Sequence, residues 1–517
     1  MASMSEQSRT KMLILLGLNL VWGFALWWSV SEHGLGTSRD SAEYLFTSLS
    51  LAGGDGFISF MGHRYVLWPP LYPMLLALLQ ILGVIDPLVS ALVLQLVTFV
   101  WIAILTAWLF VRIFPGNFAP AFLGNAIAVS GVSLTGLFQA AGSDYLFIAL
   151  MLSMVYLCDS YITHNRLRTL WLMALVSALA MLQRYIGVAL LFTAAWIVFH
   201  YSRETVRERL KRSVLLGTSV IPVGIWALTL PVEAVVRDNP SSFLENAYWF
   251  SFSILSWFFP EAELYGHPLR LQFGMWAFWL GICACSLIVW KFSSKQSYAD
   301  SARVPLFLFG GMYTVILLVI ASLSSFNALD SRFASPVFIP LVALVLATIE
   351  TILSSNLMPG GFRKMAIRLA LFIPPLILLG LSGFRSVESL QLHHEFGSGY
   401  TSREWRDNRV IAYWQSHEPG GEYLVFSNYP AGVAFHTWHV ALPSPRRTEH
   451  PNAGEVVIPL DTYLPSLFAP QEETYIIWIE PNEYTHVYSV TDLSQIGQVE
   501  SLFESSDGGI YRILPLK

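Results

Sequence analysis

Apolar runs of about twenty residues recur along this chain, and a run of that length is what a helix needs to cross the hydrocarbon core of a bilayer. Hydrophobic residues make up 54% of the 517 positions and charged residues only 13%, which gives a mean hydropathy of +0.54. One water-soluble core cannot bury that many apolar side chains, so the sequence predicts a multi-pass membrane protein. No small-residue cleavage site follows the first run, residues 12–30, so we expect a retained helix and not a signal peptide.

About eleven transmembrane helices are expected, which makes the fold class mainly α. Their approximate limits are 12–30, 88–112, 118–140, 144–162, 169–183, 185–200, 213–231, 273–291, 304–324, 333–353 and 366–384. Basic residues decide the orientation, because cytoplasmic loops collect Lys and Arg. With the N-terminus inside, Arg9, Arg112 and the cluster SRETVRERLKR (202–212) all fall on the cytoplasmic side of a plasma or inner membrane. The odd number of spans then places the C-terminus outside.

The stretch PPLYPMLLALLQILG (69–83) is apolar but short, and it begins with two prolines. If it crossed the bilayer, the alternation of basic loops downstream would invert, so we expect it to lie along the outer membrane surface or half-inserted. Residues 31–84 then form one large external loop with membrane-surface helices. A second long loop, 231–271, is rich in aromatic residues and fits an interfacial Trp/Tyr belt better than a lid over a site.

The chain changes character after Arg385, where hydrophobic runs shorten and acidic residues outnumber basic ones. We therefore divide it into a transmembrane domain, residues 1–385, and a small extracytoplasmic α/β domain, residues 386–517. A capping box is expected to begin a helix there, with Thr401 as the cap and Glu404 reaching back to its backbone amide. Three short strands are expected near 422–428, 474–480 and 509–516.

Charge and cysteine content exclude two classes of function. A net charge of −5 gives no sign of nucleic-acid binding. The three cysteines lie in apolar segments and have neither the pattern of a disulfide framework nor metal-ligand spacing; they are Cys158, Cys283 and Cys285.

Five charged residues from distant parts of the chain fall on the predicted outer side, next to membrane helices. They are Asp40, Asp144, Arg184, Asp330 and Arg332. Charged groups at membrane depth usually face a partner or a cavity, so we predict one polar cavity at the outer membrane boundary. The residues expected to support it are Asp330 itself, the sequence neighbours Arg39, Glu43 and Tyr185, and Arg64 of the first loop.

Simpler explanations exist for several of these residues. Asp144 follows Gly142 and Ser143 and could serve only as a helix cap. Arg184 and Arg332 each precede an aromatic residue and could extend toward lipid head groups. Asp40 is harder to explain in this way, because its loop contains further charged residues, namely Glu43, Asp55, His63 and Arg64.

The order of four short motifs resembles the membrane glycosyltransferases of the GT-C fold, which include the protein O-mannosyltransferases and the lipid A aminoarabinose transferases. An acid in the first external loop is followed by WPPLYPMLLAL, and then come SDYLF, QRYIG and SRFASPVFIPL. The resemblance covers roughly residues 10–385. A lone Asp40 followed by Ser41 departs from the Asp-Glu pair of the O-mannosyltransferases, which leaves the acceptor open.

The resemblance implies a sugar donor carried on a polyprenyl phosphate in the membrane lipid, and an acceptor that is a lipid, a glycan or a protein. Asp40 would be the base that deprotonates the acceptor. Arg184 and Arg332 would bind the departing phosphate, because a guanidinium stays charged and can hold two oxygens. Asp144 would orient the acceptor or, together with Asp40, hold a divalent cation such as Mg²⁺ or Mn²⁺. We expect no obligatory cofactor.

Two other classes remain open. A transporter or lipid flippase would need no covalent chemistry, but transporters usually show internal repeats and polar groups near the midplane, and this sequence shows neither. A receptor with an outer binding domain would explain the tail but not the charges beside so many helices. A glycosyltransferase is the interpretation that accounts for both.

Overall fold

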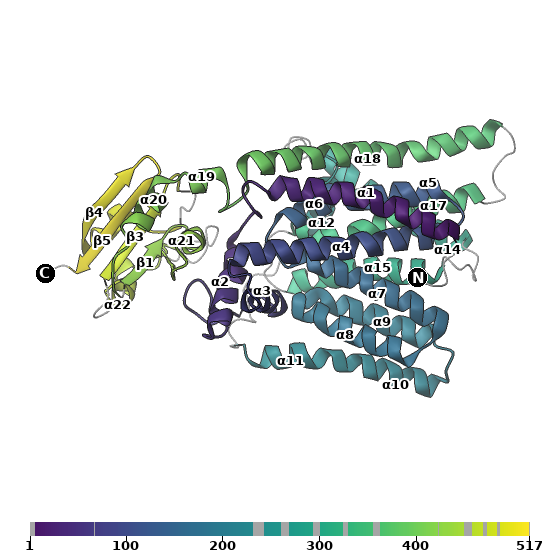
Figure 1. Ribbon diagram of the computed structural model, residues 1–517, viewed down its shortest axis with the longest axis horizontal. Coiled ribbons are helices and arrows are strands. Elements are labelled where there is room, and N and C mark those ends of the chain that lie inside the picture. The colour runs from purple at the N-terminus through teal and green to yellow at the C-terminus, as the bar shows by residue number, and fades with distance from the viewer. Residues whose placement is uncertain are drawn as a thin grey trace.

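The computed structural model describes residues 6–66, 68–230, 242–259, 268–292, 300–323, 329–354, 362–421, 423–448, 457–468, 473–482 and 486–515. Figure 1 shows two parts, an elongated bundle of helices and a domain built on a β-sheet at one end of it. The first helix begins at the opposite end of the bundle, and the chain finishes in the sheet domain. We call the two ends of the bundle the domain-side end and the N-terminal end.

Eight helical segments of the described part are long and apolar enough to cross a membrane, and each matches a predicted span. They are α1 (Glu6–Val30), α4 (Pro87–Ile113), α5 with α6 (Phe118–Ser130, Val132–Gln139), α7 (Asp144–His164), α14 (Pro268–Phe292), α15 (Asp300–Leu323), α16 with η4 and α17 (Ser331–Ala334, Ser335–Val337, Phe338–Ser354) and α18 (Phe362–Phe396). The multi-pass membrane architecture is therefore confirmed.

The other three predicted spans correspond to shorter or interrupted helices. They are α8 (Leu167–Gln183), η1 with α9 (Tyr185–Gly187, Val188–Tyr201), and α10, η2 and α11 (Val206–Gly217, Thr218–Val220, Ile221–Leu228). The count of eleven spans stays a prediction. One further helix, α12 (Phe243–Leu255), lies within the predicted loop 231–271, whose residues 231–241 and 260–267 are outside the described part.

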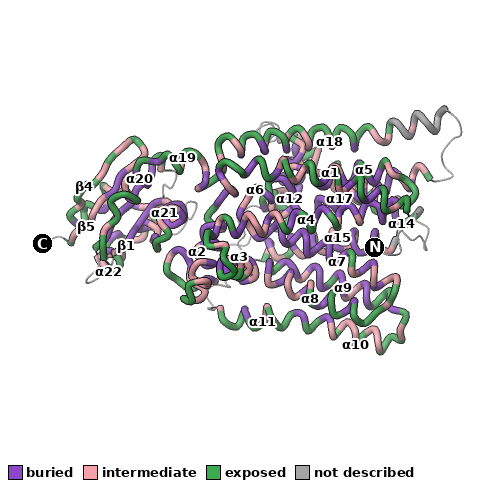
Figure 2. Tube along the Cα trace, viewed as in Figure 1, coloured by how far each residue is buried: buried purple, intermediate pink, exposed green. Residues whose placement is uncertain are grey.

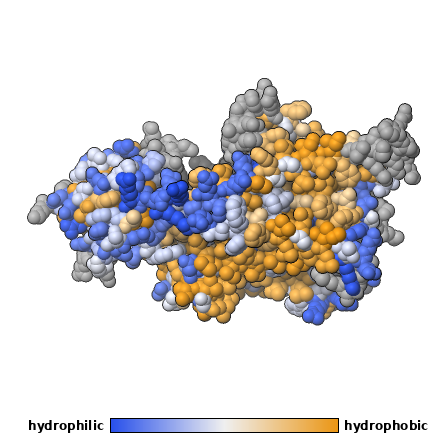
Figure 3. All heavy atoms as spheres, turned by 45° about the horizontal axis from the view of Figure 1, so that its top comes forward, coloured by the Kyte–Doolittle hydropathy of each residue, from blue (hydrophilic) through white to orange (hydrophobic). Residues whose placement is uncertain are grey.

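The sides of the bundle are apolar and its two ends are polar. Figure 3 shows a hydrophobic belt around the helices, next to a largely hydrophilic sheet domain. Figure 2 shows that exposed positions are frequent along the peripheral helices α11 and α18, whereas buried positions gather inside the bundle. Large apolar side chains such as Leu20, Val21 and Phe24 of α1 are well exposed, as lipid-facing residues are.

Basic residues gather at the N-terminal end, where several are held by carbonyls and acids. Lys11 donates to the carbonyl of Pro115 at 3.0 Å, and Arg303 to that of Ile113 at 2.8 Å. Arg112 forms a buried ion pair of 2.9 Å with Asp159. The expected separation of basic loops from the tail is thus present, while the compartment that each end faces stays a prediction.

The predicted helix 118–140 is broken in two at Gly131, whose backbone is extended. Serines of α18 satisfy the polar groups that the break exposes: Ser382 accepts from the Val132 amide at 3.2 Å, and Ser386 donates to the Ser130 carbonyl at 2.7 Å. Added side-chain volume at Gly131 would strike the Phe338 ring, at 2.3 Å from a β-carbon. The break was not predictable from the apolar pattern, because its partners come from a distant helix.

Helix α18 does not end near residue 384 as predicted but continues to Phe396. It therefore crosses the proposed domain boundary at 385/386 and carries the chain directly toward the sheet domain (Figure 1). The final turns stay helical because they pack on the first loop, where His393 bonds to the carbonyl of Gly34 at 3.0 Å.

The first loop contains two helices at the domain-side end, α2 (Arg39–Gly53) and α3 (Leu71–Ile81), which pack against each other. Ser38 and Ser41 form a capping box at the start of α2, and Gly54 ends it in a left-handed conformation. With eleven residues, α3 is about 16 Å long, too short to span a bilayer. Its exposed Met74, Leu78 and Ile81 give it the apolar outer face that a surface helix needs.

The sheet domain has five strands in the order β2-β1-β3-β5-β4. They are β1 (Tyr423–Ser427), β2 (Leu442–Pro443), β3 (Glu473–Ile479), β4 (Gly497–Ser505) and β5 (Gly508–Pro515), of which β2 and β4 were not predicted. Strand β1 pairs in parallel with β2 and β3, and β5 pairs antiparallel with β3 and β4. The predicted α/β class of the tail is confirmed.

Helices cover both faces of this sheet. Helices α20 (Arg409–Ser416) and α21 (Pro430–Thr437) pack on one face, in the same hydrophobic core as the bundle. Helices α22 (Leu464–Leu467) and α23 (Val490–Leu493) pack on the other. The predicted capping box is wrong: Ser402 is the cap of α19 (Arg403–Arg406), and Thr401 donates instead to the carbonyl of Leu35 at 2.9 Å. The hydroxyl finds a distant acceptor because the tail is packed against the first loop.

Candidate functional site

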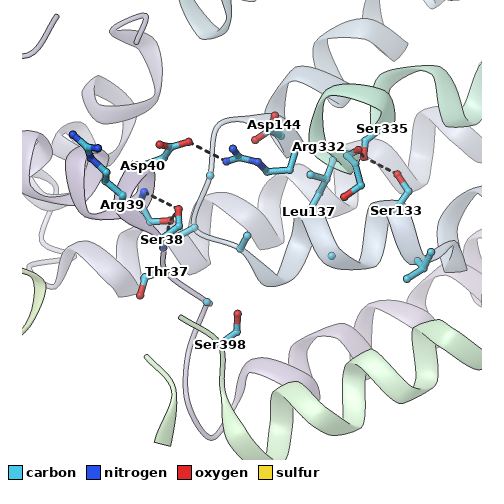
Figure 4. Close-up of a pocket in the computed structure, with 18 of the residues that line it drawn as sticks. Thr37, Ser38, Arg39, Asp40, Ser133, Leu137, Asp144, Arg332, Ser335 and Ser398 are labelled. Carbon is cyan, nitrogen blue, oxygen red and sulfur yellow. Dashed lines mark hydrogen bonds and ion pairs between the residues drawn. The ribbon is translucent and has the colours of Figure 1, made fainter. Parts of the chain in front are cut away.

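A cavity of about 470 Å³ lies at the domain-side end of the bundle. Its walls come from the start of α2, from α6 and the first turn of α7, and from the segment after α12, α16, η4 and α18 (Figure 4). Three of the five charged residues predicted to share a cavity line it, namely Asp40, Asp144 and Arg332. The prediction that these distant residues meet is confirmed for these three.

Asp40 lies in the first turn of α2, one residue after the first helical position. The capping box of Ser38 and Ser41 holds this turn, since each backbone amide bonds to the other serine's hydroxyl, at 3.0 and 3.4 Å. The carboxylate of Asp40 accepts a hydrogen bond of 3.0 Å from Nη1 of Arg332 (Figure 4). Asp40 is thus held by its backbone at one end and by a guanidinium at the other.

Arg332 is positioned by Asp330, the cap of the short helix α16. The Asp330 carboxylate accepts from the backbone amide of Arg332 at 2.9 Å and from its Nε at 3.1 Å. The guanidinium therefore bridges two carboxylates, and 41% of the side chain remains exposed. A bridging cation at the mouth of a cavity is well placed to receive an anion.

Asp144 is the first residue of α7 and forms an ion pair with Arg184, which precedes η1. The guanidinium of Arg184 also lies over the ring of Phe333, 5.0 Å from its centre. Gln183 supports this pair by donating to the carbonyl of Ser143 at 2.7 Å. Asp144 is therefore more than a cap, and Arg184 and Arg332 have acidic partners in place of lipid head groups.

The supporting residues separate into two groups. Arg39 lines the cavity, and Glu43 lies on the same helix, where burial raises the pKa of its carboxyl to about 7. Tyr185 is 41% exposed and accepts from the indole of Trp226 at 3.2 Å, outside the cavity lining. Arg64 is also exposed and lies in a β-bridge with Ile58. Arg64 is not among the residues that line the cavity.

Comparisons with known proteins rest on structure alone. No protein-family model and no curated protein matches this sequence. Among solved structures, ArnT from Cupriavidus metallidurans matches in the form bound to undecaprenyl phosphate and in the apo state, with a TM-score of 0.58 for each. The identity is 11% and 12%, over 96% of this chain and 97% of ArnT. The chain has the GT-C fold.

A second GT-C structure, the arabinofuranosyltransferase AftD from Mycobacteria, matches with a TM-score of 0.50 and 11% identity. The match covers 98% of this chain but 40% of AftD. The ArnT match, in contrast, covers nearly the whole of both chains, sheet domain included. It confirms the expected fold class. Identity this low shows a shared fold and no more.

One charged residue of the GT-C cavity was missed by sequence reasoning. Arg385 of α18 lines the cavity and donates to the carbonyls of Ser256 and Phe259, the latter at 3.1 Å, and so ties α18 to the segment after α12. The predicted helix end at 384 made Arg385 look like the start of the tail. The sequence signal was a lone arginine at the domain-side end of an apolar helix.

The wall of the GT-C cavity combines charged, hydroxyl and apolar groups. The first loop contributes charge and hydroxyl groups, whereas α6 contributes Gly136 and Leu137, and Trp257 follows α12. Across it, Ser133 donates to Ser335 at 2.7 Å (Figure 4). A cavity lined by both charged and apolar groups can hold an amphiphile that carries an anionic group.

Metal binding would have to use few ligands. Among the residues that the structure describes, no group of three or more His, Cys, Asp or Glu side chains is placed to hold a metal ion. Asp40 and Asp144 line the same cavity, but each carboxylate is already paired with a guanidinium. The structure therefore shows an arginine as the ion-pair partner of each of these two carboxylates.

Proposed function

We propose that this protein is a membrane glycosyltransferase that moves a sugar from a polyprenyl-phosphate donor to an acceptor hydroxyl, with Asp40 as the base. The observation that carries the proposal is the 3.0 Å contact between Asp40 and Arg332 in a cavity whose wall contains both charged and apolar residues. The fold supports the donor class, since the ArnT structure with this fold contains undecaprenyl phosphate.

The reaction follows from the two charges. The acceptor oxygen attacks the anomeric carbon of the sugar while its proton passes to the Asp40 carboxylate. The bond between that carbon and the phosphate oxygen breaks, and its electron pair stays on the polyprenyl phosphate. Arg332 binds the negative charge that develops there, and it can exchange Asp40 for a phosphate oxygen because its side chain is partly exposed.

The second ion pair has a supporting part in this mechanism. Asp144 lines the cavity and could orient the acceptor, whereas Arg184 is engaged by Asp144 and Phe333. We therefore assign the departing phosphate first to Arg332, and place Arg184 behind it as a source of positive potential. No divalent cation is required in this scheme.

We also propose that the cavity faces the extracytoplasmic side of a plasma or inner membrane. Basic residues concentrate at the N-terminal end of the bundle, for example in α10 and the turn before it, and cytoplasmic loops collect such residues. The sheet domain would then lie outside, at the membrane surface from which an acceptor would arrive. The identity of the acceptor, whether lipid, glycan or protein, stays open.

The test separates chemistry from transport. Purified protein in liposomes is given polyprenyl-phosphate sugars labelled in the sugar, and free polyprenyl phosphate and released or transferred sugar are both measured. A glycosyltransferase cleaves the bond between sugar and phosphate. Movement of an intact donor across the bilayer without cleavage would contradict the proposal and favour a flippase.

A further inference from the structure

We infer that the sheet domain positions Asp40, by holding the first-loop segment 34–38 against the bundle through the junction segment 397–401. The inference rests on the proposed function, because it assigns the tail a part in the same reaction. It differs from acceptor recognition, in which the tail would serve only the second substrate.

The first-loop segment lies between two other stretches of chain, and one parallel β-bridge joins it to each, from Gly36 to Ala140 of the bundle and from Thr37 to Gly399 of the junction segment. Gly36 faces the bundle: its amide donates to the carbonyl of Gln139 at 2.7 Å, and its carbonyl accepts from Ala141 at 2.9 Å. Thr37 faces the tail: its amide donates to the carbonyl of Ser398 at 3.2 Å, and its carbonyl accepts from Tyr400 at 3.1 Å. Two successive residues of the first loop, Gly36 and Thr37, thus form backbone hydrogen bonds with the membrane domain and with the tail, respectively.

Side chains of the tail add to this contact on the preceding residues. Thr401 donates to the carbonyl of Leu35 at 2.9 Å, and Arg406 to that of His33 at 3.0 Å. Further along, the amide of Ala441 donates to the carbonyl of Phe60 at 3.0 Å, and α21 packs on α2. The first loop is therefore fixed by the tail at both ends of α2.

The constraint reaches Asp40 over a short path. Thr37 is followed directly by Ser38, the cap of α2, and Asp40 lies in the first helical turn. Thr37, Ser38 and Ser398 also line the cavity with Asp40, so the junction is part of its wall. Because a cap fixes the backbone angles of the turn it begins, a shift of Thr37 would tilt the Asp40 carboxylate relative to Arg332.

Gly399 is the residue on which this contact depends. Its φ is +60°, and an added β-carbon would lie 1.7 Å from the carbonyl oxygen of Thr37, where no side chain fits. Gly421 in the same domain has a φ of +104° but nothing within 4 Å of an added β-carbon. Gly399→Ala therefore pushes the junction segment away from Thr37, and Gly421→Ala carries backbone strain without touching the first loop.

The experiment is a double-mutant cycle on donor cleavage by the full-length protein. We expect Gly399→Ala to lower kcat by about 10²-fold, the effect of a small displacement of a catalytic group, with the Kd for polyprenyl phosphate unchanged. In an Asp40→Asn background the same substitution should add less than about twofold, because it acts through Asp40. If Gly399→Ala lowers kcat by the same factor in the wild type and in Asp40→Asn, the inference is overturned, since a purely structural role of Gly399 predicts that result.

Amide hydrogen exchange tests the same inference without turnover. Residues 34–44 should exchange faster in Gly399→Ala than in the wild type or Gly421→Ala; unchanged exchange would overturn the inference. If Gly399→Ala does not fold, Thr401→Val removes one bond to Leu35 and should shift exchange and kcat in the same directions. A wild type without donor cleavage would refute the proposed function, and the exchange result would then decide the inference alone.

Discussion

Replacing Arg332 with alanine should separate rate from stability. The guanidinium bonds to Asp40 at 3.0 Å and to Asp330 at 3.1 Å, and 41% of the side chain is exposed. Exposed ion pairs contribute about 0–1 kcal/mol each, so unfolding should change little. Loss of a charge that stabilises the departing phosphate should lower kcat by about 10²–10³-fold, or about 2.7–4 kcal/mol.

The assay is donor cleavage by Arg332→Ala and Arg332→Lys, with the thermal midpoint measured on the same samples. Lysine keeps the charge but lacks the planar fork of donors with which a guanidinium holds two oxygens, so we expect it to fall between alanine and the wild type. Arg512→Ala is the matched control, because Arg512 is a partly exposed arginine paired with Glu500 at 2.6 Å in the sheet domain. A drop of less than about tenfold for Arg332→Ala would refute the assignment of the phosphate to this residue.

Three further predictions concern the cavity and its first helix. Gly136→Leu should raise KM for the lipid-linked donor about tenfold, because an added β-carbon there meets nothing within 4 Å and the leucine side chain would fill the cavity. The control is Gly17→Leu, which is equally open but lies on the outer face of α1 and should leave KM unchanged. Equal KM values for the two variants would contradict this prediction. Burial raises the pKa of Glu43 from 4.5 to about 7, so the folded protein keeps a proton that the unfolded chain has lost, and the stability linked to that proton is lost as pH rises through 7. The thermal midpoint of the wild type should therefore fall relative to that of Glu43→Gln between about pH 5 and pH 8. Parallel curves of thermal midpoint against pH for the two proteins would refute this prediction. Donor cleavage should persist in the presence of a chelator, because guanidinium groups pair with both Asp40 and Asp144. If the chelator abolishes cleavage and added Mg²⁺ or Mn²⁺ restores it, this prediction is contradicted.

Much of the fold was predictable because the bilayer imposes a length and a composition on each helix. Runs such as 88–112 and 144–162 match α4 and α7 closely. The failures occur where polar partners come from afar. The break at Gly131 depends on serines of α18, and α18 itself continues past 384 because the first loop covers its end.

The candidate site shows the same division. Charge at the edge of apolar runs pointed to Asp40, Asp144 and Arg332, and these line one cavity. The prediction for Arg64 rested only on its place in the same loop as Asp40; it lies in a separate exposed turn and does not line the cavity. Arg385 was missed because its role depends on carbonyls of a segment more than a hundred positions away, which no local pattern reveals.

Cleavage of a labelled polyprenyl-phosphate sugar by Asp40→Asn tests the central claim most directly. The matched control is Asp55→Asn, which changes an exposed aspartate of the same loop that does not line the cavity. A fall in the cleavage rate of about 10²–10⁴-fold in Asp40→Asn, with full activity in Asp55→Asn and unchanged binding of polyprenyl phosphate, is the result that our account predicts. Equal rates for Asp40→Asn and the wild type would contradict it and remove the base from the mechanism.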